Sequence, residues 1–138
     1  MQVKTSVNTN EITVLIAKPG LDGHDRGAKV ITRYLSEQNI KTKFSGIRKT
    51  PEQIANLAEK IDANIIGVSI LSGAHLELVA ELFDCLYKKE MSHVQILVGG
   101  IIPESDKEAL MTLGVKGVFG PGTPLKEIEL FIRNAYKE

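Results

Sequence analysis

Residues 12–27 read ITVLIAKPGLDGHDRG, an apolar run that passes directly into a loop rich in glycine and proline. A near-continuous apolar run of this length is typical of a strand that is covered on both faces, as in a parallel sheet. From Ala28 onward the apolar residues recur at helical spacing, so the loop of residues 18–27 joins a strand to a helix. The stretch therefore predicts the strand–loop–helix unit of an α/β protein, with a glycine-rich loop whose backbone can approach a ligand closely.

The same alternation of apolar runs and amphipathic stretches continues to the end of the chain. Thr50 and Pro51 suit the cap and the first position of a helix. Strict alternation implies parallel strands, right-handed crossovers and helices on both faces. We therefore predict an α/β fold, a doubly wound five-stranded parallel sheet of the flavodoxin-like (Rossmann-like) type with strand order 2-1-3-4-5. Its strands are expected at residues 12–17, 41–45, 64–69, 94–98 and 117–119, and its helices at residues 27–38, 51–61, 75–88, 103–113 and 125–136.

Length and composition restrict the classes of function. A chain of 138 residues suffices for one domain, which we place at residues 12–138 behind a polar tail of residues 1–11. The 17 basic and 17 acidic residues cancel and form no basic block, so a nucleic-acid partner is not expected. No apolar stretch approaches the ~20 residues that span a bilayer, and the polar start lacks the apolar core of a signal peptide. We expect a cytoplasmic protein without a membrane partner.

Two side chains outside the loops are interpreted as structural. The single cysteine, Cys85, cannot form an internal disulfide, which agrees with a reducing compartment, and we interpret it as a helix residue without a chemical role. His75 lies near the start of the third predicted helix, and we expect it to be a partly exposed helix residue.

The glycine-bearing loops of the chain are expected to meet at one edge of the sheet. In a doubly wound sheet the ligand crevice lies outside the carboxyl ends of the strands, where the winding switches between the first and third strands. Loops with glycine follow the first, third, fourth and fifth predicted strands, at residues 18–27, 69–73, 99–100 and 120–123. Each loop taken alone is better explained as a turn. Together they would leave a deep slot that suits an extended nucleotide tail.

The first of these loops contains an aspartate, Asp22, two residues before a histidine, His24. A carboxylate that binds one ring nitrogen of an imidazole fixes the other as a base or a metal ligand. Lys18 could lie behind Asp22 and keep it ionised. Alternatively, Asp22-Gly23 is an ordinary turn dipeptide, and an exposed loop histidine often has no role. The spacing alone leaves both interpretations open.

A resemblance to a known family favours the first interpretation. Residues 18–27, KPGLDGHDRG, resemble the Asp-x-His-x-x-Gly signature of cobalamin-binding domains that hold the cofactor with its own base displaced and a protein histidine on cobalt. Ser69-Ile70-Leu71 matches the Ser-x-Leu motif of that family, and Gly99-Gly100 matches its paired glycine. The longer strings, including GPGT at residues 120–123, are most similar to the cobalamin domain of methylmalonyl-CoA mutase and related acyl-CoA mutases.

The resemblance implies a cofactor, adenosylcobalamin, and a role for each matching residue. His24 would be the lower axial ligand of cobalt, with Asp22 on its far ring nitrogen and Lys18 behind Asp22 as the outer layer of that ligand. The cofactor supplies the radical chemistry, and no residue of this chain acts in the radical step itself. The lining of the slot for the nucleotide tail would comprise Ser69, Leu71, Gly99, Gly100, Gly120 and Thr123, and the remaining cofactor contacts would be Gly23, Asp25, Arg26 and Gly27.

The resemblance also implies a partner and a reaction. A barrel of ~250 residues that binds a CoA thioester does not fit in this chain, so we expect a heteromer with a large acyl-CoA-binding TIM-barrel mutase subunit, contacted through the loop edge. The enzyme would be an isomerase that rearranges the carbon skeleton of an acyl-CoA. Methylmalonyl-CoA/succinyl-CoA is the first expectation, with isobutyryl-CoA and 2-hydroxyisobutyryl-CoA as alternatives.

Other classes of protein share parts of this pattern. A corrinoid carrier for methyl transfer would also use His24, but such carriers usually have a helical cap ahead of the domain, and a non-catalytic cobalamin-binding module is a further alternative. Metal-dependent phosphohydrolases contain His-Asp pairs like His24-Asp25 but need additional metal ligands on a helical scaffold. A response-regulator receiver needs a phosphoacceptor aspartate at the end of the third strand, where this chain has Ser69.

Overall fold

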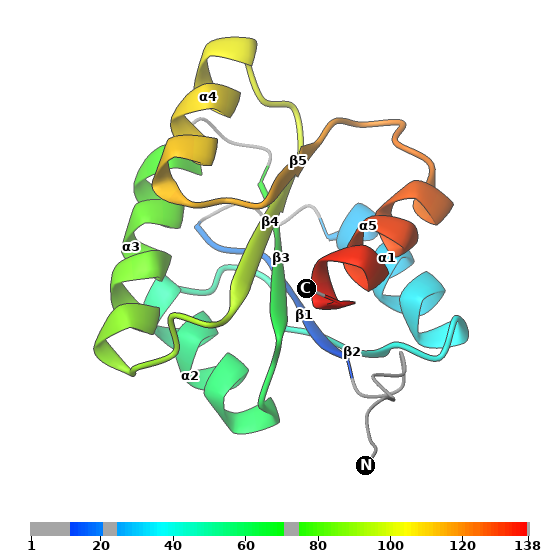
Figure 1. Cartoon of the computed structure of the whole chain (residues 1–138), viewed down its shortest axis with the longest axis horizontal. Helices are drawn as coiled ribbons and strands as arrows, with labels where there is room; N and C mark the ends of the chain where they lie inside the picture. The colour runs from blue at the N-terminus through cyan, green and yellow to red at the C-terminus, as the bar shows by residue number, and fades with distance from the viewer. Residues whose placement is uncertain (1–11, 21–24, 71–74, 138) are drawn as a thin grey trace.

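The computed structural model of the chain describes residues 12–20, 25–70 and 75–137. Its strands pair in parallel in the order β2-β1-β3-β4-β5 (Figure 1). The predicted fold class and strand order are confirmed, and no element boundary differs from the prediction by more than one residue. The strands are β1 (Thr13–Ala17), β2 (Lys41–Phe44), β3 (Ile65–Ser69), β4 (Gln95–Gly99) and β5 (Gly117–Phe119), and the helices are α1 (Arg26–Glu37), α2 (Pro51–Ile61), α3 (His75–Lys88), α4 (Glu104–Leu113) and α5 (Leu125–Lys137).

Helices cover both faces of the sheet. Figure 1 shows α1 and α5 on one face and α2, α3 and α4 on the other. Successive side chains of a strand point to opposite faces, so Val14 and Ile16 of β1 pack beneath α1 and α5, whereas Leu15 and Ala17 pack beneath the other three helices. Because both faces are buried, the strand contains a continuous apolar run instead of an alternating one.

The start of α2 follows directly from its sequence. The Thr50 hydroxyl accepts a hydrogen bond from the Gln53 backbone amide at 3.0 Å, and the Gln53 side chain accepts one from the Thr50 amide at 2.9 Å. This reciprocal capping, with Pro51 in the first turn, satisfies amide groups that have no partner within the helix. The predicted cap is confirmed.

The backbone just after β3, at Ile70, lies in close contact with the backbone just after β4, at Gly100. The Ile70 amide donates to the Gly99 carbonyl at 3.0 Å, and the Gly100 amide donates to the Phe119 carbonyl at 3.0 Å. Gly100 has φ +144°, and a Cβ at this position would overlap the carbonyl oxygen of Ile70. Glycine is therefore required here by the fold itself.

A buried polar cluster joins α1 to α5. The Glu129 side chain, in a residue that is 3% exposed, accepts hydrogen bonds from the Tyr34 hydroxyl at 2.8 Å and from Arg133 Nε at 2.9 Å. Arg133 Nη2 also donates to the Gln38 carbonyl at 2.8 Å. Burial raises the pKa of Glu129, but the hydrogen bonds from Tyr34 and Arg133 and the charges of Lys126 and Arg133 outweigh burial and hold the pKa below its ordinary value of 4.5.

Replacing Gly100 by alanine should destabilise the fold strongly. We expect Gly100→Ala to lower the free energy of unfolding by about 2–4 kcal/mol, because the new methyl group overlaps a backbone carbonyl and the φ value is unfavourable for alanine. Gly120→Ala is the matched control, since a Cβ there meets nothing within 4 Å and should change stability by less than about 0.5 kcal/mol. Urea denaturation measures both; equal stabilities would contradict the close contact at Gly100.

The stabilisation that Glu129 provides should depend on pH. Because its pKa is lowered on folding, the contribution is complete above the unfolded-state pKa and is lost as pH falls through the folded-state pKa. We expect Glu129→Gln to reduce the unfolding free energy by about 1–3 kcal/mol at neutral pH, with a difference from wild type that shrinks below pH 4.5. Glu127→Gln, on the exposed side of α5, is the control and should leave stability nearly unchanged. A difference independent of pH would exclude this role of the carboxylate.

Candidate functional site

A cavity of about 510 Å³ lies between the sheet and the two helices α1 and α5. It is on the face of the sheet where β1 and β3 pair side by side, the point at which the winding direction switches. The strand residues that line the cavity extend from the middle of the sheet to the carboxyl ends of the strands. The side chains of its helical walls are Ile31 and Leu35 from α1 and Ile128 and Ile132 from α5.

Residues at the carboxyl edge of the sheet complete the cavity. The first turn of α1, the last residue of β3 and the loops after β4 and β5 all contribute to one lining, although they are far apart in the sequence. Of the predicted site residues, the cavity is lined by Arg26, Gly27, Ser69, Gly99, Gly100, Gly120 and Thr123. The predicted site residues Asp22, Gly23, His24 and Leu71 lie outside the described residues.

Three of the lining glycines leave space that a side chain would fill. A Cβ at Gly27 or Gly120 would meet no atom within 4 Å, and one at Gly99 would meet only the Phe119 carbonyl oxygen, at 3.9 Å. Gly27 also lies in the first turn of α1, where alanine would favour the helix. The fold does not require these glycines sterically, in contrast to Gly100. The open space beside their backbones is suited to a ligand that lies against the loops.

The chemistry of the lining suits an elongated ligand with an apolar end. The described side chains deep in the cavity are aliphatic or aromatic, and Arg26 is the charged residue among those that line it. Ser69 supplies a hydroxyl group at the end of β3, and the Thr123 hydroxyl, in the loop after β5, donates to the Gly120 carbonyl at 2.7 Å. An apolar ring system fits the interior, and polar groups of the same ligand fit the loop edge.

Gly67 is one of the lining residues that the sequence analysis did not name as part of the site. Gly67 lies in the middle of β3 on the cavity side, where a Cβ would approach Ile16 Cδ1 to 3.0 Å. Its signal was present, since a glycine inside an apolar strand often marks a close approach of a ligand or another backbone.

Lys18 is fully buried where three strands end. Its amide donates to the Ser45 hydroxyl at 3.1 Å, just beyond β2, and its Nζ donates to the Ser69 carbonyl at 3.2 Å, at the end of β3. A buried ammonium group is rare in proteins unless it is paired. Lys18 therefore links the first loop to the end of β3. Asp22, the residue behind which Lys18 was expected to lie, is outside the described residues.

The described residues on either side of residues 21–24 form hydrogen bonds or ion pairs with neighbouring parts of the fold. The Lys49 amide donates to the Lys18 carbonyl at 3.2 Å, and the Gly20 amide donates to the Lys49 carbonyl at 3.1 Å, which extends the pairing beyond β1 and β2. On the other side, Asp25 is the N-terminal cap residue of α1, does not line the cavity, and forms an ion pair with Lys29 at 3.1 Å.

The expectation for His75 was wrong. The side chain is buried, with a residue exposure of 3%, and its Nε2 lies 2.7 Å from Asp106 Oδ2 of α4. The histidine begins α3 and the aspartate lies in the first turn of α4, so the pair joins the starts of the two helices that follow the loops after β3 and β4. Sequence reasoning missed it because the partner comes from a different element. The pair does not line the cavity.

The surroundings of Cys85 agree with its interpretation as a helix residue without a chemical role. Burial, together with the carboxylates of Glu52 and Asp84, raises the pKa of the Cys85 thiol, which disfavours the reactive thiolate.

In the part of the chain that the structure describes, no helix is long and apolar enough to cross a bilayer.

Comparison with known sequences identifies relatives of similar length. The 2-hydroxyisobutanoyl-CoA mutase small subunit of Aquincola tertiaricarbonis is 39% identical over 89% of this chain and 90% of its own length. The pivalyl-CoA mutase small subunit of Xanthobacter autotrophicus is 38% identical over 87% of this chain and 80% of its own. Methylmalonyl-CoA mutase of Escherichia coli is 42% identical over 81% of this chain, which spans only 16% of that protein.

Comparison with solved structures supports the fold. The monomethylamine corrinoid protein of Methanosarcina barkeri superimposes with a TM-score of 0.74 at 16% identity, over 94% of this chain and 60% of that one. A cobalamin-binding protein from Desulfitobacterium hafniense gives 0.72 at 15% identity, over 91% and 58%. A response-regulator receiver domain from Colwellia psychrerythraea gives 0.71 at 11% identity, over 93% and 100%. The fold is thus shared by proteins with different functions, and Ser69 does end β3 in this chain.

The family follows from the sequence match. The model of the B12 binding domain matches residues 12–129, which include the whole sheet and every loop at its carboxyl edge. The resemblance inferred from the separated motifs is confirmed, and the homologues are named as mutases or mutase subunits. The chain therefore belongs to the family of B12-binding domains.

Proposed function

We propose that this chain is the cobalamin-binding subunit of an adenosylcobalamin-dependent acyl-CoA mutase. The observation that carries the proposal is the apolar cavity between the sheet and helices α1 and α5, edged by glycines whose missing side chains leave open space. In a member of the B12-binding family, a cavity of this kind is the natural place for the nucleotide tail of cobalamin. Relatives of nearly equal length named as mutase small subunits support the enzyme class.

The described residues would bind the tail by shape and by a few polar groups. Gly27, Gly99 and Gly120 would let the backbone approach the tail, because none of them is crowded by the protein itself. Ile31, Leu35, Ile128 and Ile132 would surround its apolar ring. Burying such a ring against aliphatic side chains is favourable by roughly 25 cal/mol per Å² of apolar surface.

His24 would bind the cobalt of the cofactor once the base of the cofactor's own nucleotide tail is displaced from cobalt into the slot. Asp22 would accept a hydrogen bond from the other ring nitrogen of His24, which fixes the tautomer and raises the basicity of the ligand. Lys18, buried at the junction of β1 and β3, would stabilise the negative charge of Asp22. When bound, adenosylcobalamin supplies radical chemistry through cleavage of its cobalt–carbon bond.

The partner would be a large subunit with a TIM barrel that binds the acyl-CoA and encloses the reaction. The names of the small-subunit relatives support a divided mutase, and the loop edge of the sheet would face the barrel. Residues that select the substrate would lie mainly in that subunit. The substrate we propose is a short branched-chain acyl-CoA, with methylmalonyl-CoA, 2-hydroxyisobutanoyl-CoA and pivalyl-CoA as the compounds to assay, since the relatives carry these three names.

Absorption spectroscopy of the chain with adenosylcobalamin tests the proposal. We expect wild type to give the spectrum of base-displaced, histidine-coordinated cofactor, and His24→Ala to lose it, because the imidazole supplies the lower ligand. His93→Ala, which removes an exposed histidine after α3, is the matched control and should keep the wild-type spectrum. With the large subunit added, isomerisation of one of the three acyl-CoA thioesters should follow.

The opposite result would exclude this function. If wild type left the spectrum of free cofactor unchanged even with the large subunit present, the chain would not be a cobalamin subunit. If the cofactor bound and only methylcobalamin were turned over, in a methyl transfer, the chain would be a corrinoid carrier instead.

Adding a methyl group to the slot should separate binding from stability. We expect Gly27→Ala to leave the free energy of unfolding unchanged or to raise it by up to about 1 kcal/mol, since alanine favours a helix. The same change should weaken cobalamin binding by about tenfold or more, because the methyl group occupies the open space beside α1. Ser36→Ala, at an exposed position of α1, is the control. Titration calorimetry and urea denaturation measure the two quantities, and unchanged affinity would place the tail elsewhere.

A further inference from the structure

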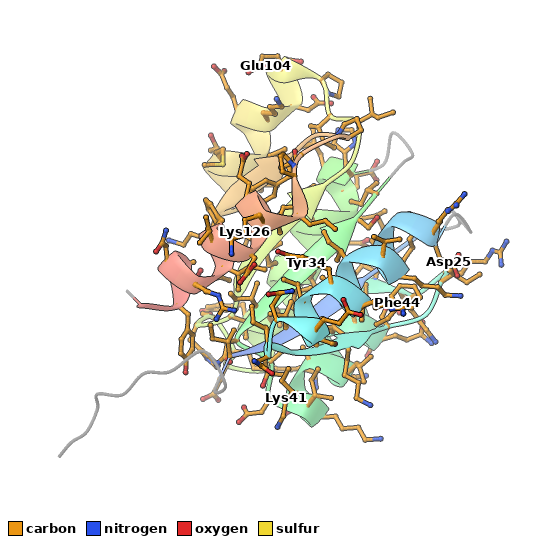
Figure 2. The ribbon with its side chains drawn as sticks, turned by 90° about the vertical axis from the view of Figure 1, so that its right-hand side faces the viewer. Asp25, Tyr34, Lys41, Phe44, Glu104 and Lys126 are labelled. Carbon is orange, nitrogen blue, oxygen red and sulfur yellow. The ribbon has the colours of Figure 1, made fainter. Side chains whose placement is uncertain are left out.

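The polar cluster between α1 and α5 lies beside the cavity, although none of its residues lines it. We define the seam cluster as Tyr34, Gln38, Glu129 and Arg133. Tyr34 precedes the lining residue Leu35 in α1, and Glu129 and Arg133 each follow a lining residue of α5, at Ile128 and Ile132. Tyr34 extends from α1 toward α5 and is seen near Lys126, in the first turn of that helix (Figure 2). The cluster therefore joins the two helical walls of the slot directly.

The cluster lies toward the end of α1 that is away from the glycine loops. Tyr34 is in the last turn of α1, and Gln38 is its C-terminal cap residue. At the opposite end, the first turn of α1 and the first residue of α5, Leu125, both line the cavity. The hydrogen bonds thus join the last turn of α1 and its cap residue to the part of α5 that follows its first turn. Among the described residues, the side-chain hydrogen bonds between α1 with its cap and α5 are those of the seam cluster.

The contacts of the cluster fix one arrangement of the two helices. Glu129 is almost fully buried and is paired with Lys126 and Arg133 of its own helix. The contact of its carboxylate with α1 is the hydrogen bond that Tyr34 donates. Sliding or separating the helices would remove one hydrogen-bond donor from a buried carboxylate. This loss costs free energy that a similar shift between apolar side chains does not. Arg133 adds a second link, through the Gln38 carbonyl at 2.8 Å.

We propose that the seam cluster sets the width of the slot and thereby controls how long the nucleotide tail of cobalamin stays bound. This inference rests on the proposed function, because it takes the cavity as the site of the tail. Tyr34, Glu129 and Arg133 are positioning residues: they act through the spacing of the two helical walls and do not touch the ligand. A corrinoid that lacks the tail would not occupy the slot, so its retention would be independent of the cluster.

Dissociation rates of two corrinoids test the proposal. The probes are adenosylcobalamin and cobinamide, the corrinoid without the nucleotide tail, each chased from the loaded chain by excess competitor. We expect Tyr34→Phe, which removes one hydrogen bond to a buried charge, to release adenosylcobalamin about tenfold faster and cobinamide within about twofold of wild type. Tyr87→Phe, on α3 at 73% exposure, is the matched control and should change neither rate.

A second variant and a second measurement complete the test. Arg133→Lys keeps the positive charge but loses the forked contacts to Glu129 and Gln38, and it should give the same selective acceleration. Hydrogen exchange in α1 of the cobalamin-loaded chain should rise in both variants and not in Tyr87→Phe. Hydrogen exchange uses only the cobalamin-loaded chain, so it tests the proposal without requiring that cobinamide bind.

The outcomes separate this proposal from the proposed function. If wild type binds no cobalamin, the proposed function itself fails. If wild type binds it, and the two seam variants release it at the wild-type rate with unchanged exchange in α1, the seam proposal is overturned. Equal acceleration of both corrinoids would also overturn it, because that pattern indicates general destabilisation of the domain.

Discussion

The parallel pairing of β1 with β3 is the constraint on which the site depends. Val14 to Ala17 lie opposite Ile65 to Val68, so the loops that follow both strands leave the sheet at the same edge. The chain then continues from β1 into α1 on one face and from β3 into α3 on the other (Figure 1). A doubly wound sheet forms its ligand crevice where the winding direction switches in this way, and the cavity beneath α1 and α5 is lined by residues of both β1 and β3. The apolar runs of the strands, which secure this pairing, therefore also determine where a ligand can bind.

Much of this arrangement could be predicted from the sequence, because it is encoded locally. Apolar runs, helical periodicity and the Thr50-Pro51 cap each depend on residues close together in the chain, and they gave the elements and the strand order. Once the order is known, topology alone brings the glycine loops to one edge. What local patterns could not reveal is which polar side chains are buried. His75 meets Asp106, 31 residues away, and Tyr34 meets Glu129, 95 residues away. An isolated glutamate in an amphipathic helix looks the same whether or not a partner helix covers it.

The glycines of the loop edge divide into two groups that sequence alone does not distinguish. Gly100 is required because its backbone meets that of Ile70, so any side chain there would break the crossing of two loops. Gly27 and Gly120 have open space around them, and the fold would accept alanine at both. A motif of glycines can therefore combine residues that build the scaffold with residues that leave room for a ligand. Both groups border the cavity between α1 and α5, but only the second leaves open space there and argues for a binding site.

Three buried ionisable side chains of the described residues lie where elements of the scaffold meet. Lys18 joins the ends of β1 and β3, His75 joins the starts of α3 and α4, and Glu129 joins α1 to α5. Apolar packing alone would hold these elements together but would tolerate small shifts of one against another, whereas a buried charge is stable only when its donors keep their places. A slot that must accept a long, flat group without closing around it needs walls whose separation is fixed. A response-regulator receiver domain shares the fold at 11% identity, so the fold alone does not determine which polar side chains stand at these joints. The spacing of the walls would therefore depend on the polar side chains that this particular sequence places there.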